Sequence, residues 1–397
     1  MKPSDDYDVI IIGGGPAGCA AAIALRQHRP NYRVLILEKQ PLPEWPLHIG
    51  ETLPPAMVGV LQSFNLWESF RELETLPAHG TRCAWGDHQL RGNDYLFQAF
   101  GPGWHVDRRK FDRWLIEQAR LAGAEYRSAA TTTDIRFRPD GAQPAWRIQT
   151  IGGETAALRS HFLVDATGRA AVIARRMNAE RLPQDQLVAY YTYLQPLADT
   201  DDSTWVEATP HGWWYSAALP DGRMVVALMS DSDIGRKLKF KHNSSWQLQL
   251  AASLWTRQRL DLNTPYQSIQ VTAAHGQQLS PCSGRGWLAV GDAATTFDPL
   301  SSLGLFKALR NSQIAAYAIG DVLDDMAAAT GGDSYDNTQP HPALSKYQAL
   351  IQAEYRDYQK QHQAYYNMEQ RFGGQPFWQR RHQLDPGDGA RAEAAAQ

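Results

Sequence analysis

Three features that this chain lacks narrow what it can be. Its 397 residues include three cysteines, Cys19, Cys83 and Cys282, whose spacing fits neither a metal site nor a CxxC redox motif. No apolar run of about 18 residues occurs, so no transmembrane helix is predicted. The formal net charge of -3 does not indicate nucleic acid or an anionic membrane as the main partner. We therefore expect a globular protein of a reducing compartment, the cytoplasm.

The most informative feature that is present is a glycine-rich turn after an apolar strand. Residues 8–12 read Asp-Val-Ile-Ile-Ile, and the turn consists of Gly13, Gly14, Gly15, Pro16, Ala17 and Gly18. In such a G-x-G-x-x-G pattern the first glycine permits a tight turn and the second lets a pyrophosphate approach the backbone. The third lets the strand pack against the helix expected at residues 19–26. Free N–H groups at the start of that helix favour phosphates.

An acidic residue at the end of the second expected strand strengthens this interpretation. Residues 33–38 read Arg-Val-Leu-Ile-Leu-Glu, so Glu38 lies twenty residues after Gly18. A carboxylate at this point accepts hydrogen bonds from a ribose. We count Glu38 and the adjacent Lys39 among the predicted dinucleotide contacts.

Two further segments combine a buried-type strand with a polar turn. Residues 287–290 form a strand that ends at Gly291-Asp292-Ala293-Ala294, and Pro299 and Gly304 then shape a loop before a helix at about residues 305–323. The other segment, residues 162–169, reads Phe-Leu-Val-Asp-Ala-Thr-Gly-Arg. Both segments are expected to end at the same edge of the sheet as the glycine turn.

With these three segments in this order, the chain resembles the FAD-dependent oxidoreductases of the class A monooxygenase and flavin-dependent halogenase superfamily. The resemblance implies that FAD is the cofactor and that Asp292 holds its ribityl chain. It also implies that the loop with Pro299, Gly304 and Leu305 lies against the isoalloxazine ring, and that Asp165 and Gly168 belong to the cofactor site. A nicotinamide-binding fold is the alternative.

Two more residues are carried over from the resembled family as FAD contacts. Arg108 stands in an Arg-x-x-Phe-Asp pattern, where a cation near the pyrophosphate or the reduced ring is physically sensible. An ordinary surface charge at a helix start is the alternative. Glu51 lies in the Gly-Glu loop that covers the flavin in halogenase-like proteins. Capping of a helix that begins at Pro54 is an equal alternative for Glu51.

The order of elements predicts an α/β protein with discontinuous domains. Alternating strands and helices favour a Rossmann-like parallel sheet of glutathione-reductase type, to which we assign residues 1–77, 106–186 and 272–330. A mostly antiparallel β-sheet substrate domain is expected from residues 78–105 and 187–271. A C-terminal helical segment is predicted at residues 343–380 and a mobile tail at residues 381–397.

Three departures from the family limit what the resemblance implies. Tryptophan halogenases carry an essential lysine on the strand that matches residues 78–83, which here read Ala-His-Gly-Thr-Arg-Cys. Their Gly-Trp-x-Trp-x-Ile-Pro signature is replaced at residues 212–218 by Gly-Trp-Trp-Tyr-Ser-Ala-Ala. Halogenation is therefore not expected. The Asp-Gly motif used for FAD and NADPH in class A hydroxylases is also altered, so an external reductase or a small reductant is an alternative to NADPH.

A more specific resemblance covers nearly the whole chain. It is to the flavoprotein maturases of quinone-cofactor enzymes such as lysine ε-oxidase and glycine oxidase, and it rests on residues 49–55, 84–86, 103–109, 212–215 and 298–302. It implies a monooxygenase that uses O2 to oxidise or hydroxylate a tryptophan of a precursor protein during cysteine tryptophylquinone formation. The expected partners are that precursor, O2 and an external reductant.

Four residues are candidates for proton transfer or for accepting an indole N–H. Histidine is the usual acid or base near neutral pH, and His48, His79 and His105 come from segments that border the substrate side. Asp298, on the loop that faces the flavin, is the fourth candidate. A structural role is the alternative for each, and no metal site is predicted.

Two other functions stay open. One is an FAD-dependent hydroxylase or reductase of a free small metabolite, for which a long apolar tunnel would be typical. The other is a non-catalytic, flavin-loaded chaperone for a precursor enzyme, which would not need any redox change of the flavin.

Overall fold

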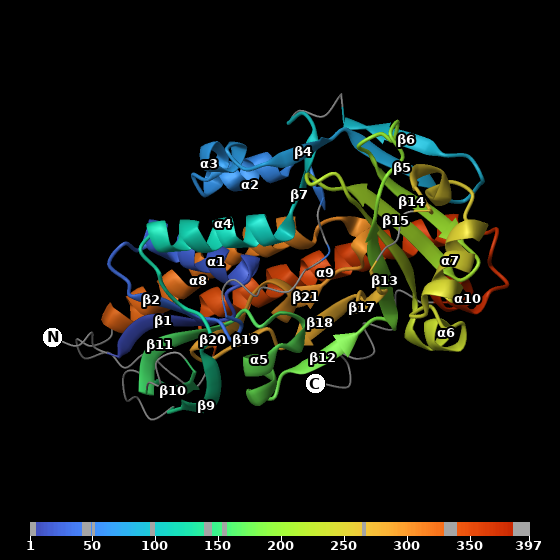
Figure 1. The fold of residues 1–397 in the computed structure, drawn as a ribbon. Helices are drawn as coiled ribbons and strands as arrows, with labels where there is room; N and C mark the ends of the chain where they lie inside the picture. Colours follow the sequence, from blue (N-terminus) through green and yellow to red (C-terminus); the bar gives the residue numbers. More distant parts are fainter. Residues whose placement is uncertain are drawn as a thin grey trace.

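The apolar run at the start of the chain forms β1 (Asp6–Ile12), a central strand of an eight-stranded sheet. The structure is a computed structural model that describes residues 5–41, 49, 52–95, 100–138, 145–152, 157–263, 267–328 and 340–383. Two large sheets, with helices packed on and between them, make up most of the fold (Figure 1).

The eight-stranded sheet is parallel at its centre. β1 pairs in parallel with β2 (Val34–Leu37) and β11 (Ala157–Asp165), and these pair with β8 (Glu125–Arg127) and β20 (Trp287–Ala289). Three antiparallel strands complete the sheet: β9 (Thr131–Phe137), β10 (Trp146–Ile151) and β19 (Ser283–Gly284). The central strands are covered on both faces, which explains why they read as uninterrupted apolar runs.

Helices α1 (Pro16–His28), α4 (Arg108–Leu121) and α8 (Gly304–Ala328) pack against one another beside this sheet. The expected stripe of α4 is buried at Phe111, Leu115 and Ala119. The short α5 (Val172–Arg176) follows β11. On the other side of α4 lie α2 (Met57–Ser63), α3 (Trp67–Arg71) and a small sheet of β3 (Thr52–Leu53), β4 (Thr75–Ala78) and β7 (Gly103–Val106).

The second large sheet has seven strands and is antiparallel at all but one pairing. Its order is β17 (Gln270–Ala273), β13 (Leu187–Leu194), β16 (Met224–Asp231), β15 (Gly212–Ala218), β14 (Thr204–Thr209), β5 (Gly80–Ala84) and β6 (Arg91–Asp94). Only β14 and β5 pair in parallel. Helices α6 (Ser232–Lys237) and α7 (Asn243–Ala252) pack on it, and a third sheet, β12 (Glu180–Pro183), β18 (Gln277–Ser280) and β21 (Thr295–Thr296), lies between the two large sheets.

Alternation along β15 separates two aromatic faces, as expected. Trp214 packs on Trp246 of α7 with ring centroids 5.0 Å apart. Trp213 and Tyr215 point to the opposite face, where Trp213 donates a 2.9 Å hydrogen bond to the Tyr366 hydroxyl. This opposite face is the one that meets the rest of the molecule.

The long helix α9 (Pro342–Met368) connects the two large sheets. Near its start, Tyr347 donates a 2.7 Å hydrogen bond to the carbonyl of Ala289 at the end of β20. Near its end, Tyr366 contacts the seven-stranded sheet through Trp213. Figure 1 shows α9 crossing from α8 toward α10 (Pro376–His382), which packs beside the same sheet.

The expected fold class, an α/β protein with a Rossmann-like parallel sheet, a mostly antiparallel second sheet and a C-terminal helix, is confirmed. The division into domains by residue number stays an interpretation. Helices α3, α5 and α6 were not predicted, and the helical segment predicted at residues 343–380 consists of α9 and most of α10. Residue 381 was assigned to a mobile tail, but Arg381 is buried and bonded to two carboxylates, and residues 384–397 lie outside the described residues.

None of the helices formed by the described residues combines the length and the apolar character needed to cross a bilayer.

The buried ion pair of Arg381 predicts a large loss of stability in Arg381→Ala. The side chains of Arg381 and Asp231 are 1% and 2% exposed, so truncation removes a buried cation from Asp231, which keeps only the half-exposed Arg380, and from Asp185. We expect the free energy of unfolding to fall by about 3 to 5 kcal/mol. The neighbouring Arg380 is 44% exposed, and Arg380→Ala should cost about 1 kcal/mol or less. Urea denaturation of both variants checks this, and equal losses would contradict it.

Candidate functional site

The glycine turn is shaped by two close backbone approaches. Gly13 has φ +111°, and a Cβ there would lie 2.1 Å from the carbonyl oxygen of Ala166. A Cβ at Gly18 would lie 2.0 Å from the carbonyl oxygen of Gly13. At Gly15 nothing lies within 4 Å of the Cβ position. Gly13 and Gly18 are therefore required by the protein's own packing, whereas Gly15 leaves space for a ligand.

The start of α1 offers unsatisfied N–H groups to that space. No side chain caps this helix and no acidic residue stands in its first turn. Glu38, only 8% exposed, accepts 2.8 Å hydrogen bonds from Gly14 N and Gln40 N and so ties β2 to the turn. A carboxylate has about four acceptor sites, so Glu38 can also accept from a ribose hydroxyl. Lys39 beside it is exposed.

Asp165 at the end of β11 holds the neighbouring loop together. It is fully buried, and its oxygens accept from Thr167 N and Oγ1 and from the N–H groups of Ile173 and Ala174. These four bonds favour an indirect role rather than direct cofactor contact. Gly168, which this loop carries, has φ +66° and an open Cβ position.

Asp292 lies between two cations on the far side of the glycine turn. Its oxygens are 3.9 Å from Lys307 Nζ and 4.0 Å from Arg169 Nε, and its side chain is 43% exposed. Gly291 has φ +59°, and a Cβ there would lie 2.5 Å from that of Ala17, so this segment is seated against α1. The Cβ position of Gly304, the first residue of α8, is open. Leu305 follows it, half-buried.

The structure places Arg108 at the first residue of α4, where it bonds to protein groups. Its guanidinium is 3.3 Å from both oxygens of Asp112 and donates to the carbonyl of Ile49 at 3.2 Å. It therefore connects α4 to the chain just before the Gly-Glu loop. Glu51 of that loop, and His48, lie outside the described residues.

His105 is the centre of a directional hydrogen-bond chain between the small sheet and the seven-stranded sheet. It is fully buried on β7, and its Nε2 lies 2.7 Å from the carbonyl oxygen of Asp202. Because a carbonyl only accepts, Nε2 carries the proton and Nδ1 is an acceptor. Thr52 Oγ1, 3.0 Å from Nδ1, must then donate its proton to His105.

Thr52 in turn receives hydrogen bonds from the seven-stranded sheet. Its oxygen is 3.0 Å from the Tyr215 hydroxyl and 3.2 Å from Thr204 Oγ1. Since its one proton goes to His105, both of these hydroxyls donate to it. The chain from Tyr215 through Thr52 to His105 therefore ties the small sheet to the seven-stranded sheet.

The other candidate histidine, His79, lies between β4 and β5 and is exposed. It is near enough to His105 to disfavour a charge on that ring. Of these two histidines only His79 is exposed, and no contact joins it to His105 among the described residues.

Asp298 lies in a buried cluster beside α9. Its carboxylate accepts from the Tyr366 hydroxyl at 2.8 Å and from Leu300 N at 2.8 Å, and His362 Nε2 is 3.2 Å away. Burial by itself would raise the pKa of Asp298. The hydrogen bond and charge of His362, together with the hydrogen bonds from Leu300 and Tyr366, outweigh burial, so the pKa of Asp298 is lowered. These contacts favour a role in holding the loop at residues 298–304.

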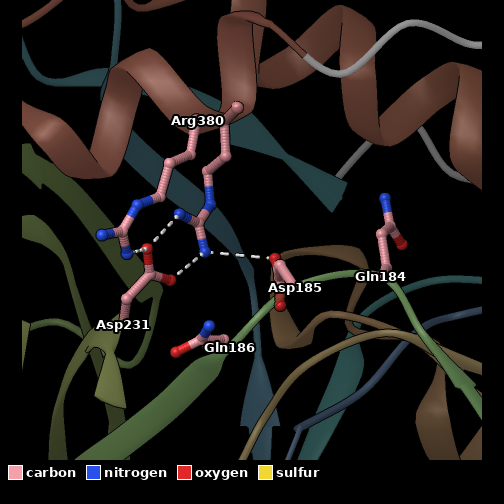
Figure 2. A pocket seen from close by; sticks show the side chains of 6 residues that line it. Gln184, Asp185, Gln186, Asp231 and Arg380 are labelled. Atoms are coloured by element: carbon pink, nitrogen blue, oxygen red, sulfur yellow. Dashed lines mark hydrogen bonds and ion pairs between the residues drawn. The ribbon is translucent and has the colours of Figure 1, made fainter. Parts of the chain in front are cut away.

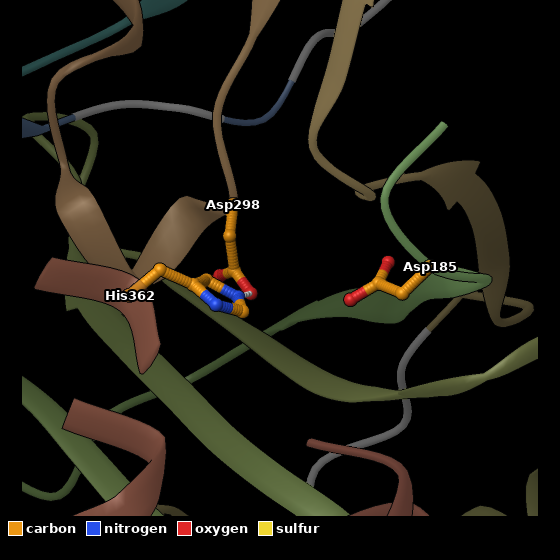
Figure 3. A group of neighbouring side chains, drawn as sticks. All are labelled: Asp185, Asp298 and His362. Atoms are coloured by element: carbon orange, nitrogen blue, oxygen red, sulfur yellow. Dashed lines mark hydrogen bonds and ion pairs between the residues drawn. The ribbon is translucent and has the colours of Figure 1, made fainter. Parts of the chain in front are cut away.

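Asp185, Asp298 and His362 together resemble a metal site (Figure 3), with ligand atoms within 4.8 Å of one another. Protein groups already occupy them, since Asp185 accepts from Arg381 at 3.1 Å and from Leu187 N at 3.0 Å. Asp298 accepts from Leu300 N and from the Tyr366 hydroxyl. The cluster is thus explained without an ion.

Arg381 also borders a cavity of about 170 Å³ between α10 and the start of β13 (Figure 2). Gln184, Asp185, Gln186, Asp231 and Arg380 complete its lining. The guanidinium groups of Arg380 and Arg381 face the carboxylates of Asp185 and Asp231 and are paired with them. The cavity therefore has no excess charge with which to attract an ion.

Sequence reasoning missed Thr52, Tyr366 and His362. One signal was available for the last two: Tyr358, His362 and Tyr366 recur at four-residue spacing and mark a polar aromatic stripe on α9. No local signal marked Thr52, because its partners come from three separate strands.

These positions can be compared with known proteins. A sequence model described as "FAD binding domain" matches residues 6–345. The chain belongs to this family. It is 29% identical over 383 residues to the "Putative FAD-dependent oxidoreductase LodB" of Marinomonas mediterranea, covering 95% of this chain and 97% of that protein.

Solved structures share the fold. The myxobacterial chondrochloren halogenase CndH superposes with a TM-score of 0.81 at 22% identity, covering 98% of this chain and 89% of that one. The peptidyl tryptophan dihydroxylase QhpG, described as essential for tryptophylquinone cofactor biogenesis, gives a TM-score of 0.72 at 24% identity, covering 95% and 78%.

The family and the geometry agree on the cofactor. Gly15, Gly168 and Gly304 leave open positions around the uncapped start of α1 and the exposed face of Asp292, as a dinucleotide with a ribityl chain requires. This protein is therefore an FAD-dependent oxidoreductase of the halogenase-like and monooxygenase type. FAD supplies the redox chemistry, and the chain supplies its binding and orientation.

Gly15→Val should weaken FAD binding without unfolding the protein. Gly15 has an ordinary backbone conformation and an open Cβ position, so the new side chain meets only the ligand space. We expect the Kd for FAD to rise about tenfold or more. Gly59→Ala, at an exposed and open position of α2, is the control and should bind FAD normally. Flavin fluorescence titration measures both, and normal binding by Gly15→Val would contradict the assignment.

His105 predicts a loss of stability in acid. Burial lowers its pKa from 6.5 to about 4, against the opposing effect of its bond to Asp202. Between these values the unfolded chain binds a proton that the folded protein does not, so stability falls as the pH falls from 6.5 to 4. We expect His105 to account for about 3 kcal/mol of this fall.

Urea denaturation at several pH values tests this in the His105→Asn variant. The variant should start less stable near neutral pH and lose less on acidification than the wild type. His242→Asn, at an exposed position, should follow the wild type. Parallel curves for His105→Asn and wild type would show that the ring is not responsible.

Proposed function

We propose that this protein is an FAD-dependent monooxygenase that oxidises or hydroxylates a tryptophan side chain of a partner protein. The partner would be the precursor of a quinone-cofactor oxidase, in which the modified indole becomes part of cysteine tryptophylquinone. FAD dependence is established above. The substrate and the partner are the proposed part.

The observation that carries the proposal is a halogenase-like fold without the halogenase lysine. The segment that should hold that lysine is β4, His79 and β5, and residues 75–84 contain none. Oxygen insertion is the remaining chemistry typical of this fold. The likeness to QhpG, whose described substrate is a peptidyl tryptophan, and the end-to-end match to LodB support a protein substrate.

The chain's own residues have three tasks in this reaction. The turn at Gly13–Gly18 and Glu38 hold the dinucleotide, while Asp292 and the first residues of α8 orient the flavin end. The bond from Arg108 to Ile49 and the chain through Thr52 and His105 position the loop and the sheet that would enclose the indole. Reduced FAD, when bound, supplies the activation of O2.

Of the candidate bases among the described residues, we assign the substrate contact to His79. An indole that is oxidised at carbon needs an acceptor for its N–H, and a neutral imidazole can serve. His79 is exposed, whereas His105 and Asp298 use their polar atoms inside the protein. His105 and Asp298 are then positioning residues, for β3 and for the flavin-facing loop.

The reaction balances with one O2 for each oxygen inserted. An aromatic C–H becomes C–OH, the second oxygen atom leaves as water, and two electrons and two protons are consumed. A reduced nicotinamide or a separate reductase must supply the electrons, because the indole ends oxidised. The altered Asp-Gly motif at residues 165–168 favours the separate reductase.

The test uses the reduced, FAD-loaded protein and the purified precursor of a quinone-cofactor oxidase, mixed without O2 and then exposed to it. We expect one tryptophan of the precursor to gain the mass of one or two oxygen atoms, measured by peptide mass spectrometry. Gly15→Val, stripped of flavin and assayed at an FAD concentration far below its raised Kd, should leave the precursor unchanged.

Each other outcome has a distinct meaning. An unmodified precursor with normal flavin reoxidation would overturn the protein substrate and favour a small metabolite. Maturation of the precursor by Gly15→Val would favour the chaperone function. A gain of chlorine or bromine in the presence of halide would show that the absent lysine is not required.

A further inference from the structure

Lys307 is a buried lysine for which the fold alone gives little reason. It lies in the first turn of α8 and is 1% exposed. Its Nζ bonds to the carbonyl of Thr295 and lies 3.1 Å from Thr295 Oγ1, and it stands 4.5 Å from the centre of the Phe297 ring. Two neutral acceptors and a ring face only partly replace the water that an ammonium group loses.

Its carboxylate partner is not buried with it. Asp292 Oδ1 is 3.9 Å from Lys307 Nζ, but the Asp292 side chain is 43% exposed and also faces Arg169 at 4.0 Å. Burial and Arg169 lower the pKa of Lys307, while Asp292 and Glu354 raise it. Glu354 is itself paired with Arg310 at 2.8 Å. Three cations and two carboxylates therefore meet here, and their formal charges add up to one positive charge. The side chains are those of Lys307, Arg169, Arg310, Asp292 and Glu354.

This charge lies where the flavin end of FAD must lie. By the family resemblance Asp292 is the residue expected to hold the ribityl chain, and Gly304 and Leu305 begin the same helical turn that carries Lys307. Reduction by two electrons leaves more negative charge on the flavin. A nearby fixed cation in a site of low dielectric favours that state, and the positive end of the α8 dipole acts in the same direction.

We propose that Lys307, with Arg169 as its more exposed companion, is a charge-tuning site that raises the reduction potential of bound FAD. The two cations flank Asp292 and leave one uncompensated positive charge beside the flavin. The protein thereby retains the reduced cofactor that O2 requires, whichever substrate it acts on.

The test measures the two-electron midpoint potential of the FAD-loaded protein by anaerobic titration against a reference dye. Lys307→Met keeps the length of the side chain and removes the charge. We expect the equilibrium between reduced and oxidised FAD to shift tenfold or more toward the oxidised form, which is about 30 mV for a two-electron couple. Lys360→Met, at an exposed position of α9 and outside this group of five charges, is the matched control and should keep the wild-type potential.

A Lys307→Met protein with bound FAD, normal thermal stability and an unchanged potential would overturn the proposal. If this variant does not fold or does not load FAD, Arg169→Gln decides the question, because its side chain is 27% exposed and tolerates removal better. A potential lowered in the same direction supports the charge-tuning site. An unchanged potential in Arg169→Gln rejects it.

Discussion

The hydrogen bond between Tyr366 and Asp298 joins the two halves of this molecule. Asp298 begins the loop that leads into α8 beside the cofactor site, and Tyr366 lies on α9, which reaches the seven-stranded sheet through Trp213. The three groups form one buried chain from indole to hydroxyl to carboxylate. Polar groups enclosed in this way need every partner, so the loop, the helix and the sheet keep one relative arrangement.

A second set of contacts acts at the opposite edge of the site. Thr52 connects the small sheet to β14 and β15, and the neutral His105 accepts the hydrogen bond that Thr52 donates. Two hydrogen-bonded supports thus join the two large parts of the fold, one at the loop of residues 298–304 and one at the small sheet. The first support is centred on the carboxylate of Asp298 and the second on the neutral ring of His105, and both groups use their polar atoms on protein partners.

The distribution of charge differs between these supports and the cofactor site. The cluster of Asp185, Asp231 and Asp298 is balanced by Arg381, Arg380 and hydrogen-bond donors. Around Asp292 the cations exceed the carboxylates, and this is where FAD brings negative charge. A protein that binds a polyanionic cofactor can leave such an excess because the ligand completes the balance.

The sequence by itself determined those features of the protein that depend on residues close together along the chain. The glycine turn, the apolar strands and the Gly-Asp segment could be predicted because turn geometry and strand burial depend on consecutive residues. These three features indicated FAD as the cofactor and an α/β fold. Burial of His105, Asp298 and Lys307 was decided only by the tertiary structure. Their partners come from β3, β15, α9 and residues 292–297, which no local pattern relates to one another. On α8, Lys307 reads like any helix lysine until the packing of Phe297 and Asp292 encloses it.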